Sequence, residues 1–433
     1  MKPHFISPRS AAPWASASLL SAAVLSIAAC AHPGAESGSG AGPAPAPVAS
    51  LVAPSPDPRV GLKAGWFDAG TAGWNMSLVS NTRPSKDFIV DSLPGNGALT
   101  NSDLAFTGHY AIQGNYAGYQ IWDVSNPNHV SLYSEKFCPG SQSDISVYGH
   151  LLFESGEATS ARIDCGLQGV KDTVSQERFR GVRIWDGTDL RNLKLIANVQ
   201  TCRGSHTHTV VSSPNDPANV YIYVSGSAPV RSSRELAGCS GSNPEDDPNS
   251  ELFRIEVIQV PLAHPEQAHV VNKPAILADL AAVEKHAETP ADQAIAAARA
   301  RARGGAGRPR GPAGPPRGPV QCHDITVYPA IGLAGGACAG YGVLLDISNP
   351  AAPKRISAVS DSNFSFWHSA TFSNDGSKVL FSDEWGGGSA PRCRSTDKPE
   401  WGADALFTLA NGKMTFKNYY KLPAPQTSEE NCV

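Results

Sequence analysis

The sequence predicts an all-β fold built from repeated antiparallel units, with few helices. Glycine and proline are abundant, at 41 and 35 of 433 residues, as in chains that turn often. Helical periodicity is confined to the N-terminus and the 280s, so most apolar segments are short and separated by turn residues. A short strand motif also recurs along the chain, which indicates a repeat architecture.

Each copy of the recurring motif opens a unit of four short strands. A second apolar strand follows the motif after a turn, a third ends in Asp in three units, and a fourth follows in four of the five. Units lie about 40 residues apart where nothing is inserted, which is typical of β-propeller blades. The five copies are Ser-Asp-Leu-Ala-Phe (102–106), Ser-Asp-Ile-Ser-Val (143–147), His-Thr-His-Thr-Val (206–210), His-Asp-Ile-Thr-Val (323–327) and His-Ser-Ala-Thr-Phe (368–372).

We therefore expect a β-propeller over residues 59–433, with about five four-stranded antiparallel blades. A lone N-terminal segment, 74–90, precedes the first blade. In propellers such a segment commonly closes the ring by pairing into the last blade. With five blades and this segment, we expect an imperfectly closed ring with an exposed edge.

An insertion at 277–319 separates the third and fourth units. It begins with an Ala-rich stretch of helical character and ends in a Gly/Pro/Arg-rich stretch that cannot pack into a core. Six arginines between 299 and 317 could contact anionic lipid or nucleic acid, but a solvated surface loop is the simpler interpretation. The net charge of −4, with only 17% charged residues, provides no overall field for nucleic acid, and we expect no such partner.

The N-terminus has the layout of a secretory signal over residues 1–29. Lys2 and Arg9 precede an apolar run that ends directly before Cys30. The small residues Ala28 and Ala29 resemble those of a bacterial lipobox, which implies that Cys30 is lipidated; cleavage without lipid is the alternative. Residues 30–58 lack the apolar residues needed for a core and predict a disordered tether. The expected location is the bacterial cell envelope, lipid-anchored on the periplasmic or surface side of a membrane.

Eight cysteines remain apart from Cys30, an even number that suits disulfides in an oxidising compartment. Eight cysteines allow 105 pairings, so the connectivity is not fixed by the sequence. We expect neighbours to pair because each pair closes a short loop. Metal thiolates are less favoured because no two cysteines have Cys-x-x-Cys spacing. The expected pairs are Cys138 with Cys165, Cys202 with Cys239, Cys322 with Cys338, and Cys393 with Cys432.

Several blade segments resemble the LVIVD-repeat propeller proteins of bacteria. They are G-Y-Q-I-W-D-V-S-N-P (118–127), C-H-D-I-T-V-Y-P (322–329) and L-L-D-I-S-N-P (344–350). The resemblance covers about residues 73–433 and implies further strands beyond the C-terminus, so we expect a truncated chain. Two segments, R-G-S-H-T-H-T-V (203–210) and F-W-H-S-A-T-F (366–372), also look distantly like selenium-binding protein and methanethiol oxidase propellers. That likeness implies histidines in a central channel.

Candidate metal ligands come from the first strand of several blades. Because blades are related by rotation about one axis, equivalent residues of the innermost strands converge on one channel. Two to four imidazoles with a carboxylate could bind copper, zinc or iron. The alternative is a ring of structural polar residues that bond between blades. The candidate residues are His206, His208 (two residues on, so on the same strand face), His323 and His368, with Asp324 and Glu384.

Two functions from different classes follow. The first is a binding or scaffold propeller of the cell envelope that holds an unknown protein or small molecule. The alternative is a metal-dependent oxidase resembling methanethiol oxidase, in which the histidines bind the metal and Glu384 or Asp324 moves protons. A third interpretation is a purely structural surface repeat. The sequence names no catalytic residue, since it contains no His-Glu-x-x-His and no Gly-x-Ser-x-Gly motif.

Overall fold

A computed structural model describes residues 50, 52, 54–58, 60–63, 68–86, 88, 100–302, 318–386, 394 and 396–421. The predicted signal sequence, Cys30, most of the tether, Cys393 and Cys432 lie outside this part of the chain. All strands given below belong to one compact unit, 53–433.

Five four-stranded antiparallel sheets confirm the predicted all-β propeller architecture. The first sheet contains β1 (Asn101–Thr107), β2 (Tyr110–Asn115), β3 (Gly118–Asp123) and β4 (Ser131–Phe137). The second contains β5 (Ile145–Tyr148), β6 (Leu151–Gly156), β7 (Gly181–Asp186) and β8 (Lys194–Gln200). The third contains β9 (Thr207–Ser212), β10 (Asn219–Ser225), β11 (Glu256–Pro261) and β12 (His269–Asn272).

The last two sheets complete the series. The fourth contains β13 (Cys322–Tyr328), β14 (Leu333–Cys338), β15 (Tyr341–Asp346) and β16 (Lys354–Val359). The fifth contains β17 (Trp367–Phe372), β18 (Lys378–Asp383), β19 (Asp404–Ala410) and β20 (Lys413–Tyr420). The repeat predicts no fourth strand for the third sheet, but the structure has one, β12. This strand is short and follows a 3-10 turn at Pro265–Gln267, so its sequence does not repeat the pattern of the other blades.

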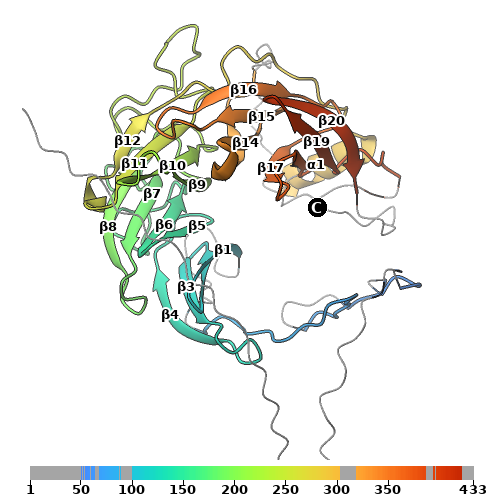
Figure 1. Cartoon of the computed structure of the whole chain (residues 1–433), viewed down its shortest axis with the longest axis horizontal. Coiled ribbons are helices and arrows are strands. Elements are labelled where there is room, and N and C mark those ends of the chain that lie inside the picture. The colour runs from blue at the N-terminus through green and yellow to red at the C-terminus, as the bar shows by residue number, and fades with distance from the viewer. Residues whose placement is uncertain are drawn as a thin grey trace, which may run out of the picture. The chain divides into compact units, whose positions relative to one another are not determined.

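The sheets follow one another as blades around an arc, with their first strands innermost (Figure 1). The first strands contact one another in the order β1, β5, β9, β13 and β17. Blade one and blade five lie at the two ends of this arc (Figure 1). Equivalent residues at the start of each first strand are thereby brought toward a common axis.

The hydrophobic core lies between neighbouring blades. Val182 and Ile184 of blade two pack with Ile222 and Val224 of blade three in one buried cluster. Every residue of β6 is buried, whereas most of β20 is exposed, so each blade runs from a buried middle to an exposed rim. Within the arc, neighbouring blades cover each other's apolar faces, which is why the repeat is needed for the core.

The close approach of blades four and five requires glycine at position 342. A Cβ atom built on Gly342 would lie 2.6 Å from the Trp367 ring and 2.8 Å from the Phe381 ring. Both rings belong to the buried core of blade five. This glycine, in the segment Y-G-V-L-L-D, is therefore a packing residue.

The first three expected cysteine pairs are present as disulfides, and the fourth lies outside the described residues. They join Cys138 with Cys165, Cys202 with Cys239, and Cys322 with Cys338. Cys322 and Cys338 are directly opposite each other on β13 and β14. Three disulfides are typical of a protein from an oxidising, extracytoplasmic compartment.

The first part of the insertion packs against the propeller. Helix α1 (Pro290–Ala302) begins after Thr289, whose hydroxyl accepts a hydrogen bond from the Asp292 backbone N–H at 3.2 Å. The Asp292 carboxylate pairs with Arg394 at 3.0 Å, and the His286 ring stacks on Trp401. Among the described residues, no helix is long and apolar enough to cross a membrane.

The N-terminal segment lies along blade one. Ser80 and Thr82 donate hydrogen bonds to the carbonyls of Pro127 and Val130, and Phe88 packs on Phe137 of β4. In its described part the segment forms no strand, and the hydrogen bonds of Ser80 and Thr82 hold it to blade one.

Candidate functional site

Three of the predicted histidines come together from three consecutive blades. His206 lies directly before β9, while His323 and His368 are each the second residue of β13 and β17. The Nε2 atoms of His206 and His323 are 2.8 Å apart, and the ring centroids of His323 and His368 are 4.0 Å apart. The rotation of blades about one axis therefore brings equivalent positions together, as the repeat predicts.

A register shift at the start of the first strand aims these side chains. In blades four and five the pairing is irregular between Cys322 and Ile325 and between Trp367 and Ala370, so each histidine sits in a β-bulge. Bulges turn a side chain out of the regular alternation and are common beside functional sites. The motif gave the positions of the histidines but not this local geometry.

Each imidazole of the cluster also faces a carboxylate. Glu157 Oε1 lies 2.5 Å from Nδ1 of His206, and Asp324 Oδ1 lies 3.1 Å from Nδ1 of His323. Glu384 Oε2 is 3.6 Å from Nε2 of His368. A carboxylate on the far nitrogen orients an imidazole and makes its other nitrogen a better ligand.

Glu157 was not among the predicted site residues. It follows β6 directly, just as Glu384 follows β18 directly. The two glutamates lie three residues after Glu154 and Phe381, which pair with the equivalent positions Ile145 and Ala370 of the first strands. Extending the repeat register to the second strand would have identified Glu157.

The electrostatics of the cluster favour a cation. Burial opposes the charge on His206, but the hydrogen bond to Glu157 and the charges of Glu157, Asp324 and Glu384 together raise the pKa of His206. Burial would raise the pKa of Glu157, but its hydrogen bonds with His206 and Ser227 and the charges of His206 and Arg180 together lower it. Burial lowers the pKa of His368, and the neighbouring His323 lowers it further. A neutral His368 beside ionised carboxylates can donate electron pairs to a metal ion.

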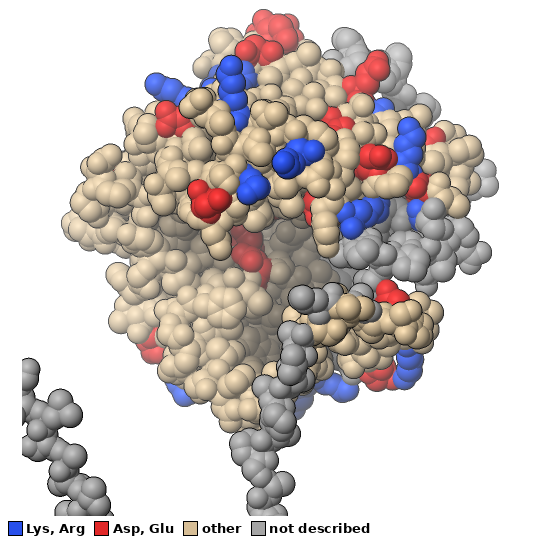
Figure 2. All heavy atoms as spheres, turned by 45° about the vertical axis from the view of Figure 1, so that its right-hand side comes forward, with Lys and Arg blue, Asp and Glu red and all other residues tan. Residues whose placement is uncertain are grey.

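His323, Asp324 and His368 satisfy a simple geometric condition for metal binding. One ligand atom from each of the three residues lies within 4.8 Å of the other two. The space-filling view shows a hollow between the blades with acidic atoms inside it (Figure 2). The residues present therefore suit a metal ion bound by imidazole and carboxylate.

His208 contacts residues of blade two, and its place on the same strand face as His206 stays a prediction. His206 directly precedes β9, and His208 is the second residue of that strand. The side chain of His208 is buried and its Nδ1 lies 2.8 Å from Ser155 Oγ. Its backbone N–H donates to Asp144 of blade two, and burial lowers its pKa to about 3. We assign His208 a structural role between blades two and three.

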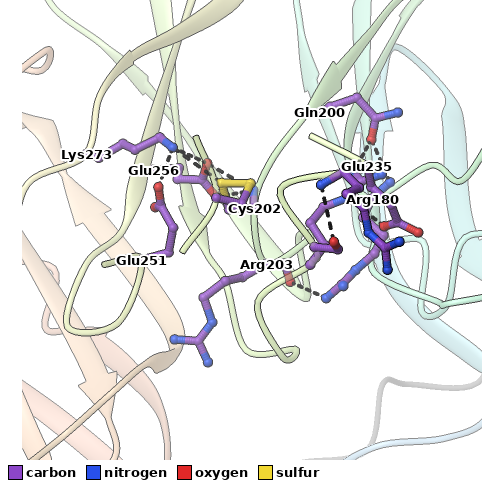
Figure 3. Close-up of a disulfide and its surroundings, with 12 residues drawn as sticks. Arg180, Gln200, Cys202, Arg203, Glu235, Glu251, Glu256 and Lys273 are labelled. Carbon is purple, nitrogen blue, oxygen red and sulfur yellow. Dashed lines mark hydrogen bonds and ion pairs between the residues drawn. A yellow bond between two sulfur atoms is a disulfide. The ribbon is translucent and has the colours of Figure 1, made fainter. Parts of the chain in front are cut away.

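A second group of possible ligands surrounds a disulfide. Atoms of Cys202, Glu251 and Glu256 lie within 4.8 Å of one another. The sulfur of Cys202 is bonded to Cys239 and is not a metal ligand in this state. Figure 3 shows this group with Lys273 beside it.

No protein family and no curated protein matches the chain. Similar solved structures include a functionally unknown protein from Desulfotomaculum acetoxidans, with 10% identity, a TM-score of 0.42, and coverage of 74% of this chain and 69% of that one. A hypothetical selenium-binding protein from Sulfolobus tokodaii has 10% identity and a TM-score of 0.40 over 73% and 64% of the two chains. The β-propeller domain of Cps50 from Myceliophteria thermophila has 8% identity and a TM-score of 0.39 over 75% of each.

With sequence identities and TM-scores this low, no function can be transferred from these proteins to this chain. The blade architecture rests on the strand pairing described above, and the resemblance to LVIVD-repeat proteins stays a prediction.

Proposed function

We propose that the protein is an exported propeller that binds a transition metal ion through His206, His323 and His368. The observation that carries this proposal is the 2.8 Å approach of the His206 and His323 Nε2 atoms, each imidazole having a carboxylate at its Nδ1. Two imidazole ligands of one ion also lie close together, because each nitrogen is about 2.0–2.1 Å from the metal.

Copper, zinc and iron are the metals that fit the donor set. Neutral imidazole suits all three, and Asp324 can supply an oxygen ligand. The imidazoles occupy only part of a metal coordination shell. A bound ion would therefore leave positions for a small ligand, which agrees with a binding role for the propeller.

The expected setting is the cell envelope. The three disulfides support an oxidising compartment. Lipidation of Cys30, the membrane as partner through that anchor, and an unknown protein or small-molecule ligand remain part of the proposal. A Cys30→Ser variant is expected to leave the membrane fraction; retention at the parent's level would contradict the anchor.

Elemental analysis of the purified protein tests the metal site. We expect a near-stoichiometric transition metal in the parent and its loss in His206→Ala/His323→Ala/His368→Ala. His269→Ala is the matched control because His269 is exposed on β12, and it should keep the metal. Metal-free parent protein after exposure to copper, zinc and iron, or metal retained by the triple variant, would overturn the proposal.

A metal-dependent oxidase is the second candidate, favoured by the position of Glu384. Its carboxylate is 3.6 Å from His368 Nε2 and is partly accessible, so it could carry a proton to or from a ligand beside the cluster. The resemblance to methanethiol oxidase implies a small thiol as substrate. Oxygen uptake by metal-loaded protein with methanethiol, reduced in Glu384→Gln at unchanged metal content, would support it. No uptake would leave the binding role alone.

A further inference from the structure

Charged and ionisable side chains surround the Cys202–Cys239 disulfide. Cys202 follows β8, and Cys239 lies in the long loop between β10 and β11. Lys273, directly after β12, and Glu256, the first residue of β11, converge on Cys202 from the same blade (Figure 3). None of these residues is a proposed metal ligand.

The two sulfurs of this disulfide face different environments. Cys239 helps to line a pocket of about 460 Å³, together with Ser240, Asp247 and Lys273. Both cysteines are buried, with 6% of Cys239 and 1% of Cys202 exposed, and only Cys239 is among the residues that line the pocket. A reagent in the pocket therefore approaches the disulfide from the side of Cys239.

An ammonium group lies beside the buried sulfur. Lys273 Nζ is 3.4 Å from Cys202 Sγ, 2.6 Å from Glu251 and 3.6 Å from Glu256. A neutral disulfide gains little from this charge, but a Cys202 thiolate would be stabilised by it. A stabilised thiolate is also a better leaving group in thiol–disulfide exchange. Among the described residues, this is the one disulfide sulfur to which a side-chain cation is hydrogen-bonded.

A buried acid lies within reach of the same sulfur. Glu256 accepts the backbone N–H of Cys202 at 3.0 Å, and its carboxylate is within 4.8 Å of Cys202 Sγ. Burial raises the pKa of Glu256 to about 7, although Lys273 opposes the shift. The carboxyl group can therefore hold or release a proton at neutral pH.

We propose that Cys202–Cys239 is a thiol–disulfide exchange site that accepts two electrons from a small dithiol bound in the adjacent pocket. A thiolate of the dithiol attacks Cys239 Sγ, the Cys202–Cys239 bond breaks, and Cys202 leaves as a thiolate beside Lys273. The second thiol of the dithiol then attacks the dithiol sulfur that is bonded to Cys239. The mixed disulfide breaks, and Cys239 is released. The dithiol is oxidised to a disulfide, and its two protons end on Cys202 and Cys239.

The measurement is the rate of reduction of each disulfide in the folded protein. Native protein is treated with limiting dithiothreitol and quenched with N-ethylmaleimide, and the labelled peptides are quantified by mass spectrometry. We expect Cys202–Cys239 to be reduced about tenfold or more faster than the buried Cys322–Cys338 bond, and Lys273→Met to slow it about tenfold. Lys273→Arg, which keeps the charge, should retain most of the rate.

Two controls separate this effect from misfolding. In Lys273→Met/Glu251→Gln, residue 251 is neutral as well, so the loss of the lysine leaves no unpaired charge at that position. The disulfide of this variant should still be reduced slowly. In guanidinium chloride the bond should be reduced equally fast in parent and Lys273→Met, because the lysine then lies far from the sulfur. Equal native rates for Cys202–Cys239 and Cys322–Cys338, or a native rate unchanged in Lys273→Met, would overturn the proposal. The metal site is not involved, so each proposal can fail alone.

Discussion

Arg183 and Glu154 form an ion pair inside blade two, with both side chains 0% exposed. The guanidinium also donates to the carbonyls of Cys138, Pro139 and Arg162, and Trp185 Nε1 donates to Glu154 at 2.9 Å. Removing one partner of such a pair leaves an uncompensated buried charge. Burial is the largest effect on both groups, raising the pKa of Glu154 and lowering that of Arg183.

Arg183→Met should therefore destabilise the protein by about 3–5 kcal/mol in urea unfolding at pH 7. Arg183→Met/Glu154→Leu should recover a large part of that loss because no buried charge remains. Asp68→Asn, in the exposed pair with Lys63, is the surface control and should show no measurable change. A loss in Arg183→Met no larger than in the control would show that the pair is not buried as described.

Glu256 gives the stability of the protein a specific pH dependence. Burial raises its pKa to about 7, so the folded protein binds this proton more tightly than the unfolded chain does. The resulting stabilisation is fully present below about pH 4.5, the range of an unfolded glutamate, and is lost as the pH rises through 7. Relative to Glu256→Gln, the parent should lose up to about 3 kcal/mol of unfolding free energy between pH 4.5 and pH 8.

Urea unfolding across this pH range measures the difference. Glu266→Gln, at an exposed site in the turn before β12, should keep the pH dependence of the parent. Parallel pH profiles for the parent and Glu256→Gln would contradict the raised pKa.

At the level of strands, blades four and five meet at a glycine. Gly342 on β15 leaves no room for a Cβ atom against the Trp367 and Phe381 rings. Gly342→Ala forces one strand or one ring to move, and we expect a cost of about 1–3 kcal/mol in thermal or urea unfolding. Gly335→Ala on β14 is the milder comparison, since a Cβ atom added there would lie 3.2 Å from its nearest neighbour, the Cβ atom of Ala370. Equal stability of Gly342→Ala and the parent would show that the two blades are less tightly packed than described.

Strand identity followed from sequence because each blade repeats one pattern of alternating apolar residues and turns. The first and second strands lie close to their expected residues, and neighbour pairing of cysteines matches three disulfides. The position of Glu157 follows from the repeat register of the second strand. The approach of Lys273 to Cys202 does not, because these two residues are 71 positions apart and lie outside the repeat motif.

At the scale of the whole propeller, stability should decrease from the middle of each blade to its rim. The second and third strands, such as β6 and β7, are almost fully buried, whereas β4 has no buried residue and β20 is largely exposed. Exposed outer strands can open without disturbing the clusters between blades. Amide hydrogen exchange should therefore be slowest in β6, β7, β10 and β15 and fastest in β4 and β20. Equal protection of inner and outer strands would indicate that each blade opens only as a whole.

The contact between His206 and His323 also has a consequence for the motion of the blades. The two residues are 117 positions apart and belong to consecutive blades. An ion held by both residues would bind the folded protein and not the unfolded chain, and would act there as a reversible cross-link between the two blades. A bound ion would then restrict how far blades three and four can move apart, and the concentration of the metal would set the stiffness of that part of the arc.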